Sequence, residues 1–160
     1  MMLNVSFKKF KDVHKKKKNQ AIFFAINSTS DYHINNLINN FLNEKNSFIF
    51  ESVEKGKIKG RYTIFGKNPS DIWEFNDNRC FRILNNKRKS IKGSPKKIIE
   101  KIIEDFKFKL PRQLPPISSL ISGFFSYDII RYIEKIPNNC KNDLKIPDVR
   151  LLKPKNNYYS

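Results

Sequence analysis

Two stretches near the start of the chain carry apolar residues at the spacing of regular secondary structure. Residues 21–26 form an uninterrupted apolar run, which predicts a strand over Gln20–Ile26 that is covered on both faces. Ser28–Asp31 then offers helix N-caps. The positions that follow repeat the i, i+3, i+4, i+7, i+8 pattern of one helix face: Ile34, Leu37, Ile38, Phe41 and Leu42. We therefore expect a strand followed by an amphipathic helix.

The next apolar runs are short and separated by turn residues. Phe48–Phe50 and Tyr62–Phe65 flank a polar connection that contains Gly56 and Gly60, which predicts two strands joined by a loop. Glu51 and Ser52 follow directly on the first run, so a carboxylate and a hydroxyl are expected at the edge of a core.

An antiparallel meander is predicted to follow. Asp71–Phe75 and Arg79–Leu84 alternate in polarity around Asn76-Asp77-Asn78, the pattern of a hairpin. A second turn at Asn85-Asn86 leads into a basic strand or loop, Lys87–Gly93. Trp73 lies in one of these strands, where a packing role is expected.

The second half of the chain mixes helix and strand signals. Ser94-Pro95 is an N-cap followed by proline at the first helical position, and an apolar stripe follows it: Ile98, Ile99, Ile102, Ile103 and Phe106. A strand over Leu120–Phe125 is predicted to lead into a helix that begins at Asp128, in which Arg131 and Glu134 can pair. The fold class is therefore α+β: an antiparallel sheet meander with two to three packed helices.

Length and charge bound the organisation of the chain. At 160 residues we expect one domain over 20–152, with a basic N-terminal arm over 1–19 and a polar tail over 153–160. A net charge of +17 raises nucleic acid or an anionic membrane as partners. The lysines are scattered, however, and Lys, Asn, Ile and Phe are all plentiful, as compositional drift would produce. The densest cluster, Lys15–Lys18, is interpreted as part of a solvated arm.

The residues offer little chemistry of their own. Cys80 and Cys140 have no partnering Cys or His at metal-ligand spacing, which argues against structural zinc. We find no clustered carboxylates, no nucleophile and base pair, and no glycine-rich phosphate loop. Neither a signal peptide nor an apolar segment of membrane-spanning length is recognised. We expect a cytoplasmic protein with no membrane partner, no metal site and no cofactor of its own.

The stretch Glu51-Ser52-Val53-Glu54, Gly56 and Gly60-Arg61-Tyr62-Thr63-Ile64-Phe65-Gly66 resembles the N-terminal signature of anthranilate synthase component I. In that family a Glu-Ser pair, ten residues and a second Ser mark the tryptophan feedback site. Ten residues separate Ser52 from Thr63 here, and Thr63 keeps the hydroxyl. The resemblance implies an L-tryptophan site in which Ser52 bonds the inhibitor, Glu51 fixes its ammonium group, and Arg61 or Thr63 closes the loop.

A second stretch resembles the same family. Its Pro-Pro segment, Gly-aromatic pair, Tyr-Asp, Arg and Glu match Pro115-Pro116, Gly123, Tyr127-Asp128, Arg131 and Glu134, and Asp143–Asp148 resembles its Leu-Pro-Asp segment. The family's usual Gly-Gly pair is Ser119-Leu120 here, and a Gly that commonly precedes Tyr-Asp is Ser126. The likeness runs from about Ala21 to Leu152.

The resemblance covers only the N-terminal part of the family's enzyme. It implies a regulatory and structural fragment whose partners are the C-terminal chorismate-binding half and a glutamine amidotransferase. The magnesium ion and the catalytic residues of the complete enzyme belong to that C-terminal half, and the fragment's strands to a larger sandwich. The complete enzyme makes anthranilate from chorismate and ammonia, in the pathway to tryptophan.

Two alternatives stay open at this point. The related aminodeoxychorismate synthase component I, of the folate pathway, shares the architecture, although the pattern over Glu51–Gly66 favours anthranilate synthase. A basic nucleic-acid-binding module would explain the charge, but neither aromatic and basic interleaving on a sheet face nor a recognition-helix pattern supports it.

Overall fold

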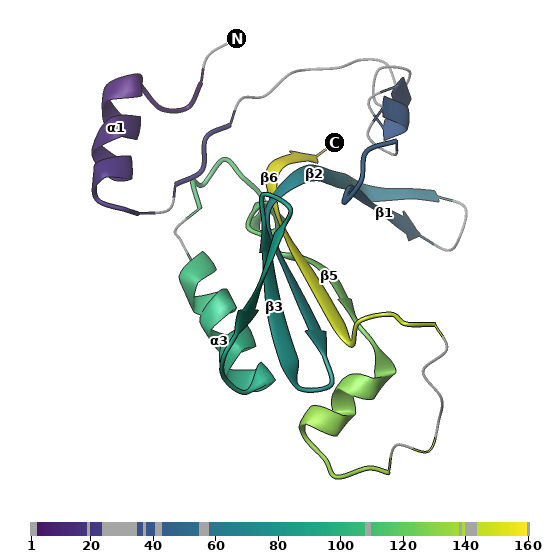
Figure 1. The fold of residues 1–160 in the computed structure, drawn as a ribbon. Helices are drawn as coiled ribbons and strands as arrows, with labels where there is room; N and C mark the ends of the chain where they lie inside the picture. The colour runs from purple at the N-terminus through teal and green to yellow at the C-terminus, as the bar shows by residue number, and fades with distance from the viewer. Residues whose placement is uncertain are drawn as a thin grey trace.

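The fold is an open antiparallel sheet with helices beside it, which confirms the predicted α+β class (Figure 1). The computed structural model describes residues 3–18, 20–23, 35–36, 38–40, 43–54, 58–107, 110–137, 139 and 144–159; for 53–54, 58–62 and 156–159 it describes the backbone alone. The elements are α1 (Phe7–Lys15), β1 (Phe48–Glu54), β2 (Ile58–Asn76), β3 (Arg79–Leu84), β4 (Lys87–Ile91), α3 (Pro95–Phe106), the 3₁₀ helices η1 (Pro116–Ser118) and η2 (Tyr127–Tyr132), β5 (Ser122–Phe125) and β6 (Val149–Tyr159).

β2 is the organising strand of the sheet. The strand order is β4-β3-β2-β6-β5, and β1 pairs with β2 as well. β2 is 19 residues long, and it joins two runs that the sequence predicted as separate strands. The pairing of β2 with β6 shifts register between Pro69 and Asp71, an irregularity that fits a proline with no N–H to donate.

Both predicted hairpin turns are confirmed. Asp77 and Asn78 have φ of 47° and 63°, and Asn85 and Asn86 have φ of 48° and 61°. Positive φ at both central residues is the geometry of a type I′ turn, whose twist matches that of the flanking strands. These two turns produce the predicted meander of β2, β3 and β4.

The core lies between α3 and one face of the sheet. Its buried cluster consists of Trp73, Phe75, Cys80, Ile98, Ile102, Val149 and Leu151. The predicted helix at Pro95 is confirmed as α3, whose Ile98 and Ile102 enter this core. The expected packing role of Trp73 is confirmed too.

Some predicted elements differ from the structure. Gln20–Phe23 contains no regular strand, and the rest of the strand predicted over 20–26 lies outside the described residues. The backbone is helical at residues 35–36 and 38–40, as predicted, while Ile34, Leu37, Phe41 and Leu42 lie outside the described residues.

Both ends of the chain hold more structure than expected. Residues 153–159, predicted as a polar tail, continue β6 and pair with β2 as far as Tyr159, opposite Ile64. The basic arm contains α1, although little periodicity was recognised there. The proposed domain boundaries at residues 19 and 152 remain predictions.

Candidate functional site

The first signature lies on the pairing of β1 with β2. Glu51 is directly opposite Thr63, and the register then shifts, so that Val53 is opposite Lys59. Four positions on β2 therefore correspond to two on β1, and Ser52 lies at this irregularity. The structure places Thr63 directly across from Glu51, and Ser52 follows Glu51 on β1.

These three side chains differ in how far they are exposed to solvent. Thr63 is 1% exposed, whereas Glu51 and Ser52 are both exposed. The expectation that the Glu51 carboxylate and Ser52 hydroxyl sit at the edge of a core is therefore wrong: they face solvent, and Thr63 is the buried member. The side chain of Arg61 lies outside the described residues, although its backbone is part of β2.

Phe50, next to Glu51 on β1, is also exposed and was not singled out from the sequence. Its side chain is 48% exposed although its cross-strand neighbour, Ile64, is buried. Phe48 and Phe50 are two positions apart in β1 and therefore share one face of the strand, and their ring centroids are 5.2 Å apart. The signal in the sequence was the period of two, which places Phe48 and Phe50 on one face of the strand.

Gly123, from the second signature, allows a close approach between two strands. It lies in β5 opposite Leu151 of β6. A Cβ atom at this position would lie 1.9 Å from the carbonyl oxygen of Arg150, well inside contact distance. The matching glycine is therefore required for β5 to pair with β6.

The remaining matched residues lie on or near η2. The predicted α-helix is a 3₁₀ helix over Tyr127–Tyr132. Arg131 pairs with Asp128, with 3.1 Å between Nη2 and Oδ1, and not with Glu134 as predicted. The physical reason is that η2 ends at Tyr132, so Glu134 lies beyond the last turn, whereas residues three apart within a 3₁₀ helix are aligned.

Asp148 joins η2 to the strands. Its Oδ2 accepts a hydrogen bond from the Tyr132 hydroxyl at 2.6 Å and another from the Asp77 amide at 3.1 Å. Its own amide donates to the carbonyl of Phe75, and its carbonyl accepts from the amide of Ser126. Burial, followed by the hydrogen bond to Asp148, raises the pKa of Tyr132 well above its ordinary value. These contacts indicate a structural clamp at the turn between β2 and β3.

Large apolar side chains are exposed around this clamp. Tyr127 is 93% exposed, Ile133 76% and Leu144 75%. Other exposed apolar side chains in the same part of the chain are Phe124, Phe125, Ile136 and Ile146. We name these seven residues the η2 surface. Exposed apolar side chains this numerous in one part of the chain favour an interface with another polypeptide.

The described residues contain no candidate metal-binding cluster. Nowhere among them do three or more His, Cys, Asp or Glu side chains converge in a way that could hold a metal ion. They therefore do not fit the magnesium ion expected for the complete enzyme, and no chemical step is assigned to them. In the part of the chain that the structure describes, no helix has the length and apolar character needed to cross a membrane.

Comparison with known proteins identifies relatives. No family model matches the chain. It is 29% identical over 154 residues to anthranilate synthase component 1 of Cereibacter sphaeroides, an alignment that covers 93% of this chain and 31% of that protein. The component 1 of Acetivibrio thermocellus is 35% identical over 106 residues, 66% of this chain and 22% of the relative.

A plant relative matches as well. The chloroplastic anthranilate synthase alpha subunit 1 of Oryza sativa subsp. indica is 33% identical over 119 residues, which cover 68% of this chain and 21% of that protein. The chain thus spans between about a fifth and a third of the length of these relatives. It belongs to the anthranilate synthase component 1 family and corresponds to the N-terminal part of its members.

Proposed function

We propose that this chain supplies the inhibitor-sensing and structural part of an anthranilate synthase, an enzyme of the cytoplasm that makes anthranilate from chorismate and ammonia. The observation that carries the proposal is the register of β1 and β2, which places Glu51, the neighbour of Ser52, opposite Thr63. The named function of the relatives supports the reaction class. Because the chain spans a minor share of each relative, catalysis itself is assigned to the C-terminal half.

L-tryptophan is the ligand proposed for the β1–β2 surface. The Ser52 hydroxyl and Glu51 carboxylate are exposed and therefore accessible to the amino and carboxylate groups of an amino acid. Phe50 offers a half-exposed ring on the same strand, against which an indole could pack. Arg61, next but one to Thr63, is the proposed partner for the inhibitor's carboxylate. Thr63, which is buried opposite Glu51, or Arg61 is proposed to close the loop.

The C-terminal chorismate-binding half is the proposed occupant of the η2 surface. Ile133 and Leu144 are strongly exposed, and covering such apolar side chains with another polypeptide lowers the free energy of the complex. A second feature points to the same partner. β5 pairs with one edge of β6 only as far as Leu152. Among the described residues no strand pairs with that edge after Leu152, so the backbone groups there are open to an added strand.

Feedback inhibition requires a difference in binding between two arrangements. Tryptophan would bind one arrangement of the two halves better than the other, typically by about 1–3 kcal/mol. A glutamine amidotransferase that delivers ammonia is the further proposed partner. The alternative reading as aminodeoxychorismate synthase component I is less well supported, because the relatives described above carry the name anthranilate synthase.

The test is reconstitution of the enzyme from two pieces. The chain is mixed with the part of the Cereibacter sphaeroides component 1 that follows the aligned region, and anthranilate formation from chorismate and ammonia is followed by fluorescence. We expect a stable complex and activity that neither piece shows alone. Activity of the C-terminal piece that is equal with and without the chain would overturn the proposal.

Matched variants locate the interface. Ile133→Asp places a charge on the η2 surface and is expected to weaken association by about tenfold or more, since an unpaired charge would be buried. Leu84→Asp makes the same kind of change at an exposed apolar residue at the end of β3, and should leave association unchanged. Equal losses in both variants would contradict the proposed surface.

A further inference from the structure

The N-terminal helix α1 is amphipathic and stands apart from the core. None of its residues is buried. At 100° per residue, Phe7, Phe10, Val13 and His14 share one face. Lys8, Asp12 and Lys15 lie on the opposite face, and Lys9 and Lys11 flank the apolar one. Residues 3–18 hold seven lysines and a single acidic residue. The segment that the sequence indicated to be a solvated basic arm is therefore an ordered helix with an apolar face.

Specific contacts join α1 and the residues before it to the segment Gln20–Phe23. The Asn4 side chain donates to the carbonyl of Ala21 at 3.2 Å and accepts from the amide of Phe23 at 2.9 Å. The Gln20 side-chain amide donates to the carbonyl of Phe10 at 3.2 Å. Ser6 caps the helix by accepting from the amide of Lys9. These contacts fix the helix but leave the start of its apolar face uncovered.

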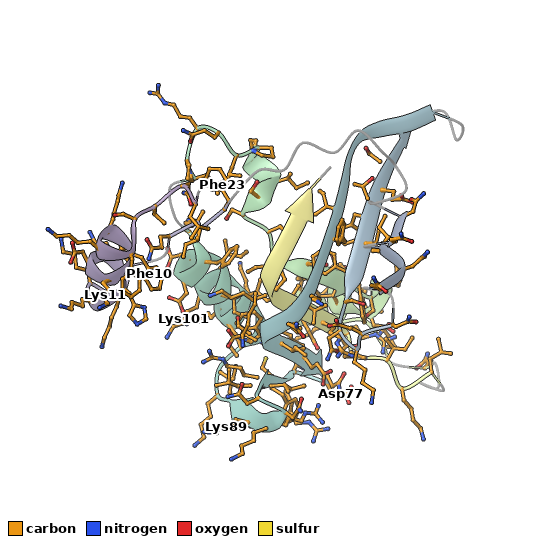
Figure 2. The ribbon with its side chains drawn as sticks, turned by 90° about the horizontal axis from the view of Figure 1, so that it is seen from above. Phe10, Lys11, Phe23, Asp77, Lys89 and Lys101 are labelled. Carbon is orange, nitrogen blue, oxygen red and sulfur yellow. The ribbon has the colours of Figure 1, made fainter. Side chains whose placement is uncertain are left out.

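The uncovered end is strongly apolar. Phe7 is 70% exposed and Leu3 61% exposed, and Ile22, beside the Asn4 contacts, is exposed as well. The Phe7 and Phe10 rings stack with centroids 6.5 Å apart. Lysine side chains, Lys11 among them, spread outward from the helix around this row (Figure 2). Apolar side chains thus lie directly beside a cluster of positive charges.

We propose that α1 is an interfacial anchor that binds the surface of an anionic phospholipid bilayer. Phe7 and Leu3 would enter the boundary between headgroups and acyl chains, and the lysines would contact lipid phosphates. The long lysine stems allow the ammonium groups to reach the headgroups while the helix lies in the plane of the interface. The inference adds a membrane partner that the sequence did not predict, and it does not rest on the proposed function.

Lipid fits this helix better than nucleic acid does. A single-stranded nucleic acid would need a free aromatic face on which to stack a base. The ammonium group of Lys11 lies over the Phe7 ring, 4.5 Å from its centroid, and Phe10 stacks beside that ring. Insertion into a bilayer requires instead that an apolar side chain be accessible, as the exposure of Phe7 and Leu3 provides.

The test is sedimentation of the full 160-residue chain with vesicles. One set contains phosphatidylcholine alone, and the other contains phosphatidylcholine with a quarter of phosphatidylglycerol. We expect binding to the anionic vesicles to exceed binding to the neutral ones by about tenfold or more and to fall with added salt. Equal binding to both sets, or no binding to either, would overturn the proposal. So would binding to a single-stranded RNA without binding to anionic vesicles.

Variants separate the two contributions. Phe7→Ser keeps every charge and should lower binding to anionic vesicles by about fivefold or more, because its apolar contact is lost. The pair Lys8→Gln and Lys15→Gln should lower it by about tenfold. The control pair, Lys87→Gln and Lys89→Gln, removes the same charge from exposed positions on β4 and should change binding less than twofold. Unchanged vesicle binding by Phe7→Ser would leave charge alone as the cause and refute the anchor. Equal losses of binding in the two lysine pairs would refute it as well, because they would show that α1 is not the binding site.

Discussion

Glu51 of β1 lies directly opposite Thr63 of β2, and only the Glu51 side chain faces solvent. This pairing brings together two ends of a signature that are 12 residues apart in the chain. It also assigns the two hydroxyls of the signature to different environments. Ser52, next to Glu51, is exposed, whereas Thr63 is 1% exposed.

Substitutions at the two hydroxyls should therefore differ in their effect on stability. Thr63→Asp buries a charge and is expected to lower the free energy of unfolding by about 3–5 kcal/mol. Ser52→Asp, the matched change at an exposed position, should cost no more than about 1 kcal/mol. Urea denaturation followed by Trp73 fluorescence measures both. Equal losses would show that the assigned burial is wrong.

The contact of Gly123 with the backbone of β6 makes a second prediction. Gly123→Ala places a methyl group against the Arg150 carbonyl, where no flexible side chain can yield, so one strand must move. A loss of about 2–4 kcal/mol in unfolding free energy is expected. Phe125→Ala, at a half-exposed position on the same strand, serves as the control and should cost less than about 1 kcal/mol. A neutral Gly123→Ala variant would exclude this pairing of β5 with β6.

The Tyr132–Asp148 hydrogen bond predicts a dependence on alkaline pH. The pKa of Tyr132 is raised above its ordinary value of 10.0. The folded chain therefore holds this proton more tightly than the unfolded chain does. The contribution of the protonated Tyr132 hydroxyl to the free energy of unfolding is fully present below pH 10 or so and is lost as the pH rises. Burial raises the pKa of the Cys80 thiol from 9.0 to about 11, which adds a loss of the same sign from a lower pH.

Thermal unfolding between pH 8 and 12 or so checks this prediction. Tyr132→Phe should lower stability at neutral pH, because a hydrogen bond of 2.6 Å is lost, and should reduce the further loss above the ordinary tyrosine pKa. Cys80→Ala isolates the thiol's share. A Tyr132→Phe chain whose alkaline loss equals that of the parent would refute the assignment.

Ser126 offers a substitution expected to stabilise the chain. Its Oγ is buried and has no hydrogen-bond partner, and the residue stands where the family commonly has glycine. Its backbone has φ of −72° and ψ of 164°, a conformation that alanine adopts without strain. Ser126→Ala should raise the free energy of unfolding by up to about 1 kcal/mol, since an unpaired hydroxyl is removed from the interior. A lower midpoint of denaturation would show that this hydroxyl is paired.

The elements that the sequence predicted well are those determined locally. Asn85-Asn86 favours a type I′ turn whatever surrounds it, and Ser94-Pro95 followed by isoleucines at helical spacing specifies α3. β6 beyond Leu152 was missed because its residues are polar and only pairing with β2 makes them a strand. The long strand β2 was predicted as two runs, Tyr62–Phe65 and Asp71–Phe75, because the residues between them are not apolar.

The spacing between Ser52 and Thr63 singled out the segment that forms β1 and β2, and the assignment of the site to it stays a prediction. The register of β1 and β2 depends on a shift that no local pattern reveals. The same limit applies to Arg131, whose choice of Asp128 over Glu134 depends on where η2 ends. The hairpins of β2, β3 and β4 were predictable, whereas the register shift of β1 on β2 and the end of η2 were not.

Calorimetric titration of L-tryptophan tests the central claim most directly. The ligand is added to the chain alone, to the chain mixed with the C-terminal piece of a component 1, and to the same mixture carrying Ser52→Ala. We expect heat of binding in the mixture only, and its loss in the Ser52→Ala mixture. Absence of heat from a mixture in which the two pieces are shown to associate would contradict the inhibitor site and leave the chain a structural part of the enzyme.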